Sequence, residues 1–446
     1  MKLKKILCTV LCALLLVSPV QVFASTLYVS DSQIVSCKTP VSAADTELAW
    51  AVKLGSSYKD APSPQVVVGD TLIVMSNKKL LKLNVKNGKT VKSTDMVDMP
   101  SYSYTPPVYA NGVIYCPLDN AKIQAFDYKT MKSLWVYSDP LGGQSLTPIT
   151  YSDGCIYTGF WNDEDRKANY VCINVTDENK KETHEAKKAT WTYTSLGGFY
   201  WAGCAAVGDN VVFGCDDGTI YANKNSKAVS INKKTGKLVD TLPIVGDQRS
   251  SMTYQNGTLY FTTKAGYLYS VKLNANGTFN DSSVKRLSLG GASTSTPLIY
   301  NGRLYLGVQG KGFGAGYFKV IDANRLAVIY SAQTKGYPQG KFLLSDAYLK
   351  DTGKVNIYIT YNCAPGGVTV FKDSAGQTVA DMQELYTPTG EKSNYCISSI
   401  VAGENGTIFY KNDSGYIFAL RNKTEKISFF KRIINAIVSF FKKLFG

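Results

Sequence analysis

The sequence predicts an all-β fold in which repeated four-stranded units close into a single ring. Two observations predict it: a turn pattern that recurs along the chain, and a composition with 30 Tyr and 38 Gly in 446 residues. Abundant Tyr and Gly are typical of short strands joined by tight turns. Hydrophobic residues make up 44% of the chain, which allows a sizeable core and argues against general disorder.

The recurring unit is a Ser/Thr-Pro or small residue, a short apolar run, a Gly turn, and a second apolar run ending in an aromatic residue. Its clearest copy runs from Thr296 to Tyr305 around the turn Asn301-Gly302. Asn-Gly and Gly-Asp pairs supply the positive φ that a hairpin needs. The turn glycines at 69, 112, 154, 208, 257 and 302 are 42 to 54 residues apart, a period that suits one four-stranded propeller blade.

Two degenerate copies, ending at Tyr358 and Tyr410, bring the number of units to eight. We therefore predict an eight-bladed β-propeller over residues 46–421, with seven blades as the alternative. The last copy stops after its third strand, at Leu420, and an unassigned strand with Trp50 precedes the first copy. We expect this N-terminal strand to complete the last blade, because pairing removes two exposed edges.

A second motif follows each hairpin, of the form A-x-D-x-x-T-G-x-x-x-W, as in Ala125 to Trp135, where Met131 stands in place of the glycine. With the turn pattern, it resembles the PQQ-like β-propeller repeat family of the quinoprotein alcohol dehydrogenase-like superfamily, and most of all its secreted Gram-positive type. In the superfamily's dehydrogenases, the quinone lies between a tryptophan and a disulfide of adjacent cysteines, and calcium is bound by Glu, Asn and Asp. This sequence has no adjacent cysteine pair.

We therefore expect neither PQQ nor calcium, and no other cofactor. The resemblance then implies a non-catalytic binding or scaffolding role. The alternative is a quinoprotein dehydrogenase-like or glycan-active enzyme on the same propeller. The single histidine, His184, excludes a multi-histidine metal site and argues against a Ser-His-Asp triad.

The loops between blades are where a propeller usually binds its ligand. Two of them, residues 159–162 and 197–203, combine aromatic residues with glycines, and residues 249–251 place a cation beside hydroxyls. This mixture suits a sugar or a peptide, although aromatic-glycine pairs also pack blade against blade. The predicted ligand-binding residues are Trp161, Tyr200, Trp201, Arg249, Tyr337, Gln339 and Asn412.

The acidic runs 163–165 and 216–217 are interpreted as solvated turn residues, since buried carboxylates are rare. Eight cysteines follow residue 24. Cys204 with Cys215, and Cys155 with Cys172, are candidates for pairing across hairpins, and small buried residues are the equally open alternative.

The net charge of +15 is concentrated at the two ends. Residues 1–24 carry +3 and residues 422–446 carry +5, which leaves 15 − 3 − 5 = +7 for residues 25–421. No basic cluster in that middle part suggests nucleic-acid binding. Residues 1–24 combine a basic start, an apolar run and a small-residue end, which predicts a signal peptide and an exported, cell-surface protein. The alternative is an uncleaved membrane anchor, although the apolar run is short for a span. Residues 25–45 are interpreted as an N-terminal lead segment that connects the signal peptide to the propeller.

Residues 422–446 predict a basic amphipathic helix with a wide aromatic face. Such a helix suits the surface of an anionic membrane, and the alternative is packing against the propeller or a partner protein. The residues predicted to contact the membrane are Phe430, Lys431, Arg432, Phe441, Lys442 and Lys443. A protein or glycan is the partner expected at the propeller face.

Overall fold

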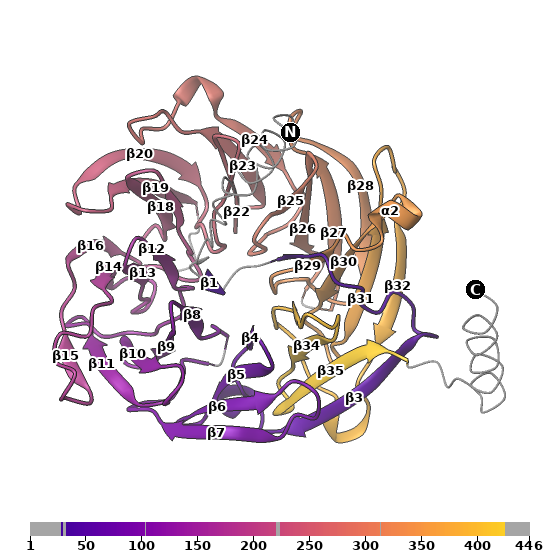
Figure 1. Cartoon of the computed structure of the whole chain (residues 1–446). Helices are drawn as coiled ribbons and strands as arrows, with labels where there is room; N and C mark the ends of the chain where they lie inside the picture. The colour runs from indigo at the N-terminus through magenta and orange to yellow at the C-terminus, as the bar shows by residue number, and fades with distance from the viewer. Residues whose placement is uncertain (1–27, 30–32, 103, 220–223, 313, 424–446) are drawn as a thin grey trace, which may run out of the picture.

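The computed structural model describes residues 28–29, 33–102, 104–219, 224–312 and 314–423. The predicted signal peptide and residues 424–446 of the predicted C-terminal helix lie outside these ranges. The predicted start of that helix at residue 422 is wrong, because Asn422 is the last residue of a strand. The described chain is a ring of eight four-stranded blades (Figure 1). This confirms the all-β propeller and decides for eight blades over seven.

The first four blades follow one another along the chain, and each is an antiparallel sheet with its first strand nearest the axis of the ring. Their strands are β4 (Val66–Val68), β5 (Thr71–Ser76), β6 (Lys79–Asn84) and β7 (Thr90–Asp95) in blade 1; β8 (Val108–Ala110), β9 (Val113–Leu118), β10 (Lys122–Asp127) and β11 (Ser133–Ser138) in blade 2; β12 (Thr150–Ser152), β13 (Cys155–Gly159), β14 (Lys167–Asn174) and β16 (Trp191–Leu196) in blade 3; and β17 (Ala205–Val207), β18 (Asn210–Cys215), β19 (Asn225–Asn232) and β20 (Leu238–Val245) in blade 4.

The second four blades repeat this order, and the last one borrows a strand from the start of the chain. Their strands are β21 (Thr253–Gln255), β22 (Thr258–Thr263), β23 (Tyr267–Lys272) and β24 (Lys285–Ser288) in blade 5; β25 (Leu298–Tyr300), β26 (Arg303–Gln309), β27 (Gly316–Asp322) and β28 (Ala327–Thr334) in blade 6; β29 (Leu343–Ser345), β30 (Val355–Thr360), β31 (Val368–Asp373) and β32 (Asp381–Tyr386) in blade 7; and β33 (Val401–Ala402), β34 (Ile408–Lys411), β35 (Tyr416–Asn422) and β3 (Thr46–Lys53) in blade 8.

The ring closes where a strand from the start of the described propeller meets its last strand. Strand β3 pairs antiparallel with β35, from Thr46 opposite Asn422 to Lys53 opposite Tyr416. The predicted completion of the last blade by the N-terminal strand is therefore confirmed. Trp50 also donates its indole N–H to the carbonyl of Val85 at 3.0 Å, so β3 is joined to blade 1 as well as to blade 8.

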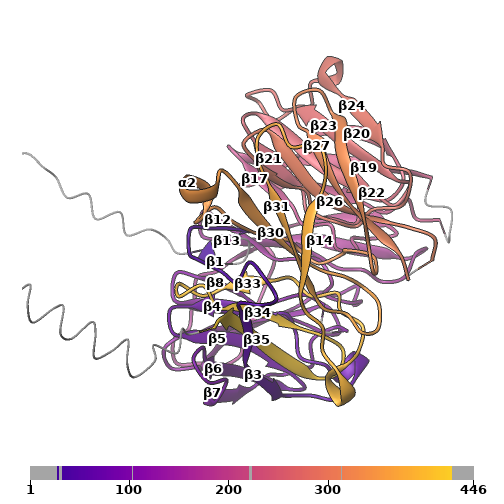
Figure 2. The ribbon, with the colours of Figure 1, turned by 90° about the vertical axis from the view of Figure 1, so that its right-hand side faces the viewer.

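The alternation of strand direction gives the ring two different faces. One carries the tight turns between the first and second strands and between the third and fourth strands of each blade, and we call it the turn face. The other carries the leading loop before each first strand and the loop between the second and third strands, and we call it the funnel face. The helix α2 (Leu349–Thr352) joins β29 to β30 and projects from the turn face (Figure 2). No helix among the described residues is long and apolar enough to cross a membrane.

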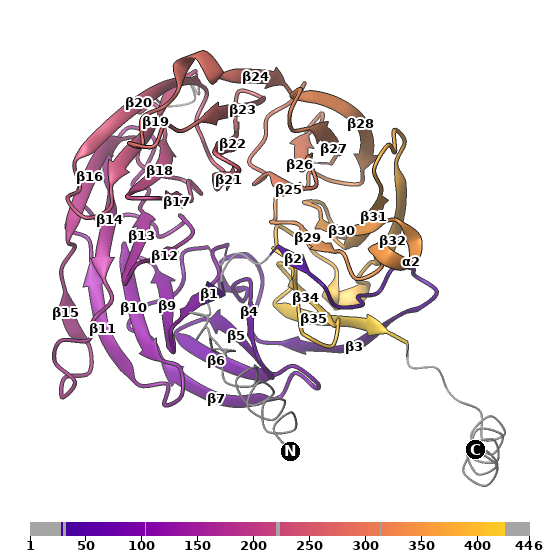
Figure 3. The same ribbon diagram turned by 45° about the horizontal axis from the view of Figure 1, so that its top comes forward.

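Three short strands extend the blades. β1 (Tyr28–Val29) pairs with β8, and β2 (Ile34–Val35) pairs with β29, so the lead segment adds to inner strands of blades 2 and 7 at the turn face (Figure 3). β15 (Glu185–Lys187) lies in the charged insertion of blade 3 and runs parallel to β11 of blade 2. It therefore covers an outer edge that would otherwise be unpaired.

Apolar residues from facing blades fill the space between them. Between blades 3 and 4, for example, the rings of Tyr170 and Phe213 stack with centroids 3.7 Å apart. All eight described cysteines are free thiols, and five of them are buried, as expected for small core residues. Ala205 lies opposite Val212, a register that offsets Cys204 from Cys215 by two residues.

Candidate functional site

A cavity of about 330 Å³ opens at the centre of the funnel face. Aromatic rings and side-chain amides line it, and every lining residue is uncharged. The rings come from the leading loops of blades 1, 2 and 4 and from the loop after β13, while the amides come mainly from blades 3 and 7. The lining residues are Tyr58, Tyr102, Tyr104, Gln144, Trp161, Tyr200, Trp201, Gln339, Asn362 and Ile397.

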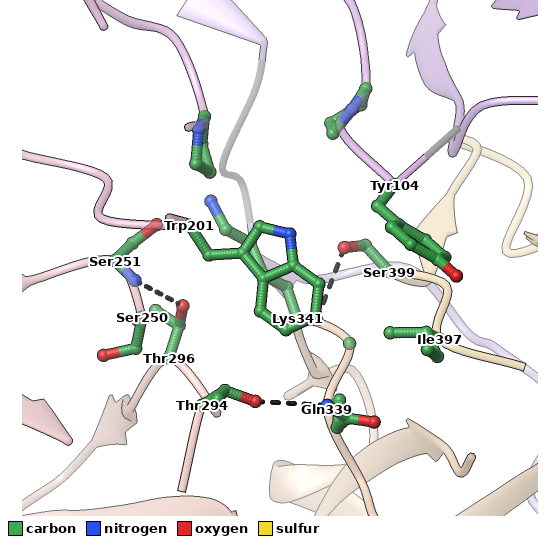
Figure 4. A pocket seen from close by; sticks show the side chains of 13 residues that line it. Tyr104, Trp201, Ser250, Ser251, Thr294, Thr296, Gln339, Lys341, Ile397 and Ser399 are labelled. Carbon is green, nitrogen blue, oxygen red and sulfur yellow. Dashed lines mark hydrogen bonds between the residues drawn. The ribbon is translucent and has the colours of Figure 1, made fainter. Parts of the chain in front are cut away.

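A narrower cavity of about 60 Å³ adjoins the first one and shares Tyr104, Trp201, Gln339 and Ile397 with it. Figure 4 shows the indole of Trp201 standing at its centre, among hydroxyls from the leading loops of blades 5, 6 and 8. Lys341 is the charged residue of its lining. Because Trp201 faces both spaces, it forms the floor of the wide cavity and a wall of the narrow one.

Four aromatic rings form a continuous arc around the cavity. Trp161 meets Tyr200 edge-on with ring centroids 5.2 Å apart, Tyr200 meets Trp201 at 4.9 Å, and Trp201 meets Tyr104 at 6.0 Å. Edge-to-face pairs of this kind add about 0.5–1.5 kcal/mol beyond the area they bury. The arc is therefore fixed by contacts among its own members before any ligand binds.

The backbone beneath this arc is unusual. Tyr58, Tyr102 and Trp201 have φ angles of 54°, 45° and 57°, in the left-handed region that bulky side chains avoid. Many of the other left-handed positions, such as Asn111, Asn256 and Asn301, are asparagines in hairpin turns, where this conformation is ordinary. Left-handed aromatic residues therefore gather at the cavity, and such strain concentrates at binding and active sites.

Glycine allows the loop that carries Tyr200 and Trp201 to approach the neighbouring loop. Gly198 has a φ of +64°, and a Cβ there would lie 2.8 Å from the carbonyl oxygen of Phe160. The following residue, Phe199, donates its backbone N–H to the same carbonyl at 3.0 Å. The loop 197–203 is thereby held against the loop that carries Trp161.

Arg249 supports the arc from below. Its guanidinium lies 4.6 Å from the ring centre of Tyr200 and contacts three carboxylates. It donates to both oxygens of Glu164, at 2.9 and 2.7 Å, and to Asp216, and it lies 3.8 Å from Asp247. We call these four residues the Arg249 cluster. At the other end of the arc, the buried Lys411 lies 5.4 Å from the ring of Tyr104 and pairs with Asp413 at 3.0 Å.

The Arg249 cluster carries more carboxylates than cations. Burial raises the pKa of Asp247 to about 6 although Arg249 opposes the shift, and burial also raises the pKa of Asp216 well above its usual range. Lys264 lies near enough to interact with the cluster, and burial lowers its pKa. Three carboxylates therefore face a single guanidinium, and burial opposes the charged forms of Asp216 and Asp247.

The structure brings four of the seven predicted ligand-binding residues together in the cavity lining: Trp161, Tyr200, Trp201 and Gln339. The amide of Gln339 is oriented by its neighbours, since it donates to the hydroxyl of Thr294 at 3.3 Å and accepts from Asn362 at 2.8 Å.

The other three predicted residues are buried beside the cavity. Arg249 lies beneath Tyr200. Tyr337 is 2% exposed, and its hydroxyl accepts the backbone N–H of Thr294. Asn412 is fully buried and donates to the carbonyl of Lys392 at 2.7 Å. The structure thus uses the polar atoms of Tyr337 and Asn412 to hold loops.

One interpretation of the sequence is wrong. Glu164 and Asp216 were expected to be solvated turn acids, but only 22% of the Glu164 side chain and 1% of the Asp216 side chain are exposed. The stacking of blades 3 and 4 brings both to Arg249, and the ion pairs permit their burial. Tyr58, Tyr102 and Tyr104 also line the cavity but were not predicted from the sequence. They lie in leading loops equivalent to the one that carries Tyr200 and Trp201, and this shared position is the signal that could have identified them.

The indole N–H of Trp161 is buried and has no hydrogen-bond acceptor among the described residues. Trp161 lines the wide cavity and also an adjoining one of about 420 Å³ at the rim. A buried donor without an acceptor is uncommon and needs an explanation. Its position is that expected for a donor to a bound molecule or an ordered water.

Among the described residues, the three carboxylates of the Arg249 cluster are the group that could provide ligands to a metal ion. Single oxygens of Glu164, Asp216 and Asp247 lie within 4.8 Å of one another, and carboxylates suit calcium or a lanthanide. The guanidinium of Arg249, however, contacts all three. A second cation at this position would be repelled, so the cluster does not fit a metal ion while Arg249 is in place. The expected absence of PQQ and calcium remains a prediction.

Comparison with known proteins gives information about the fold. No family model matches the sequence, and no curated protein matches it. Among solved structures, a europium-containing methanol dehydrogenase has a TM-score of 0.61 at 11% identity, over 85% of this chain and 87% of that one. This chain has the quinoprotein-type propeller fold.

Two further structures support the same conclusion. The quinohemoprotein alcohol dehydrogenase from Comamonas testosteroni has a TM-score of 0.58 at 12% identity, over 88% of this chain and 79% of that one. BamB from Moraxella catarrhalis has a TM-score of 0.53 at 12% identity, over 84% of this chain and 99% of that one. The resemblance to the PQQ-like propellers predicted from the repeats is thus confirmed at the level of fold. Identities this low leave the function to be argued from the site itself.

Proposed function

We propose that this protein is a non-catalytic binding protein that holds a segment of an uncharged glycan in the funnel-face cavity. The observation that carries the proposal is the lining of that cavity: an arc of four rings with side-chain amides and no charged residue. Aromatic rings cover the C–H face of a sugar, and amides both donate to and accept from its hydroxyls.

Size and charge favour a glycan over the other classes of ligand. The volume of about 330 Å³ falls within the range of about 300–1,000 Å³ typical of small-molecule sites. A folded protein partner would need about 800 Å² of contact on each side. A charged ligand would have to leave water for an uncharged lining, which is unfavourable. The indole N–H of Trp161, which has no acceptor among the described residues, is a ready donor for a sugar hydroxyl.

The fluorescence of the protein provides the test. Trp161 and Trp201 line the cavity, whereas Trp50, Trp135 and Trp191 are buried elsewhere. Titration with neutral hexasaccharides of glucose and N-acetylglucosamine, in α and β linkages, should change the emission with a measurable Kd. Trp201→Ala should weaken binding at least tenfold, because the residue lies at the centre of the arc.

The matched control is Tyr254→Ala, which removes a tyrosine that is 39% exposed in β21, next to a tight turn at the turn face. It should leave the Kd unchanged. Failure of every oligosaccharide to bind would overturn the glycan proposal. It would also be overturned if the Trp201→Ala variant bound an oligosaccharide as tightly as the wild type does. Release of new reducing ends during the titration would overturn the non-catalytic role and favour a glycan-active enzyme.

The proposal includes attachment at the cell surface. It is supported by the pattern of residues 1–24 and by the basic amphipathic pattern of residues 422–446. Flotation of the full chain with vesicles of neutral and anionic phospholipid tests the second part. We expect binding to anionic vesicles, and loss of binding when Lys431, Arg432, Lys442 and Lys443 are changed to Gln. Equal flotation of both forms would contradict membrane attachment.

A further inference from the structure

A further cavity, of about 800 Å³, lies on the turn face between blades 3 and 4. The turns that line it include those between β12 and β13, between β17 and β18, and between β19 and β20. It is remote from the funnel, because these turns lie at the opposite ends of the strands. Unlike the funnel cavity, it contains a thiol, Cys155, with the ammonium group of Lys233.

The thiol of Cys155 does not stand alone. Cys155 pairs with Asn174, and Tyr157 pairs with Cys172. Cys155 and Cys172 are therefore diagonal neighbours on one face of the β13–β14 pair, and their thiols interact closely enough to shift each other's pKa. Cys155 is partly exposed, whereas Cys172 is buried behind it.

The surroundings of the two thiols differ in the way expected of an attacking and a resolving cysteine. The interaction with Cys172, with smaller contributions from Tyr157 and Lys233, lowers the pKa of Cys155 to about 7, against partial burial and the nearby carboxylate of Asp153. The same interaction, together with burial, raises the pKa of Cys172. The thiolate is the reactive form, so the accessible cysteine is the nucleophilic one.

We propose that Cys155 and Cys172 form a thiol–disulfide exchange site that reacts with small-molecule disulfides entering the turn-face cavity. The Cys155 thiolate attacks one sulfur of the disulfide RSSR, the S–S bond breaks, and RS⁻ leaves with the electron pair. Cys172 then gives its proton to solvent, and its sulfur attacks Cys155, which expels the second RS⁻. The two protein thiols lose two electrons and two protons, and RSSR becomes two RSH.

The strand geometry indicates that the resulting bond is reversible. Diagonal neighbours in an antiparallel pair are about 7–8 Å apart, slightly beyond the usual Cα separation of about 4.4–6.8 Å in a disulfide. Cys155 is the first residue of β13, directly after the turn Asp153-Gly154, where a small backbone shift is easiest. Strained, exposed disulfides are the labile ones. The site therefore acts as a redox switch and not as a permanent cross-link.

Reaction of the folded full chain with glutathione disulfide at pH 7.5, followed by peptide mass mapping, tests the proposal. The wild type should form a Cys155–Cys172 bond without retained glutathione, and excess dithiothreitol should restore both thiols. Cys172→Ser should instead accumulate glutathione on Cys155. Cys155→Ser should leave Cys172 unmodified, because Cys172 is buried.

The chain provides its own controls. Cys37 and Cys363 are also partly exposed, but burial raises their pKa. At pH 7, iodoacetamide should alkylate Cys155 about tenfold faster than either, after allowing for the weaker nucleophilicity of a low-pKa thiolate. Equal rates at the three cysteines would overturn the proposal. So would retained glutathione on the wild type, or a cross-link from Cys155 to Cys204, which lies in the same apolar cluster.

Discussion

Two guanidinium–carboxylate sites lie on opposite faces of the described ring, one at the buried Arg249 and one at the partly buried Arg303. On the turn face, Arg303 at the start of β26 meets Asp373 at the end of β31 with contacts of 2.6 and 2.9 Å. The hydroxyls of Tyr305 and Tyr330 donate to the same carboxylate at 2.8 and 2.9 Å. This site has one positive and one negative charge, and its hydrogen bonds join blades 6 and 7.

The Arg249 cluster on the funnel face is unbalanced. It has three carboxylates around one guanidinium, and its cation also lies against the ring of Tyr200. The first site fits a structural brace, since its groups are all paired within the protein. The second site has more carboxylates than guanidinium groups, and it lies directly beneath the aromatic arc. We infer that the first site holds the ring together and that the second positions a binding surface.

Removing the carboxylate of the balanced site should have the largest effect on stability. Asp373→Ala leaves the partly buried guanidinium of Arg303 and two tyrosine hydroxyls without their acceptor, and the expected loss is about 3–5 kcal/mol in the free energy of unfolding. Urea denaturation measures it. Oligosaccharide affinity at the funnel should not change in the protein that remains folded, and a parallel loss of affinity would contradict the assignment of this site as a brace.

Arg249→Met should destabilise the protein less, by about 2–3 kcal/mol at pH 7, because the carboxylates it leaves can take up protons. It should also weaken oligosaccharide binding several-fold, since Tyr200 loses the cation beneath its ring. The stability defect should shrink at pH 5, where protons replace the guanidinium. Unchanged affinity would show that Arg249 does not position the arc.

The pH dependence of the two sites should also differ. The pKa of Asp247 is raised to about 6 from 3.8, so between these values the folded protein holds a proton that the unfolded chain has released. This contribution to stability is complete below about pH 4 and is lost as the pH rises through 6.

The comparison of wild type with Asp247→Asn isolates this effect from other titrations. Relative to the variant, the wild type should lose about 1–2 kcal/mol of stability between pH 4.5 and pH 7, measured by urea denaturation at each pH. A difference between the two proteins that is independent of pH would rule out proton uptake at Asp247.

The smallest effect is expected from the left-handed tyrosine at the rim. Tyr58 has a φ of 54° and is 53% exposed, so Tyr58→Gly removes backbone strain from the folded protein. The glycine also raises the conformational entropy of the unfolded chain, which opposes that gain. The stability should change by less than about 0.5 kcal/mol, while oligosaccharide affinity should fall. Asn256→Gly, at a left-handed hairpin position on the turn face, should match it in stability and leave affinity intact.

The ring was predictable from the sequence because each blade is encoded by a short pattern of turn and strand residues that repeats along the chain. Each hairpin has its own Gly turn, and Trp50 with Leu420 marked the strand that completes the last blade. The aromatic arc was partly predictable, since Trp161, Tyr200 and Trp201 lie in loops whose composition is unusual. The Arg249 cluster was not, because Glu164 and Asp216 are separated in sequence and meet only when blade 4 stacks on blade 3. A single sequence gives no signal of that approach.

The pairing of β3 with β35 also determines when folding can finish. Glu47 and Arg421, bonded at 2.7 Å, are 374 residues apart, so β3 leaves the ribosome before every blade and its partner strand leaves after them. Until β35 is available, β3 lacks the strand with which it pairs in the ring. Chains cut short before residue 401 leave β3 unpaired and are prone to pair with one another, whereas a peptide of residues 401–423 added in trans would complete the ring. Closure of the ring therefore waits for β35, the last strand of the described chain.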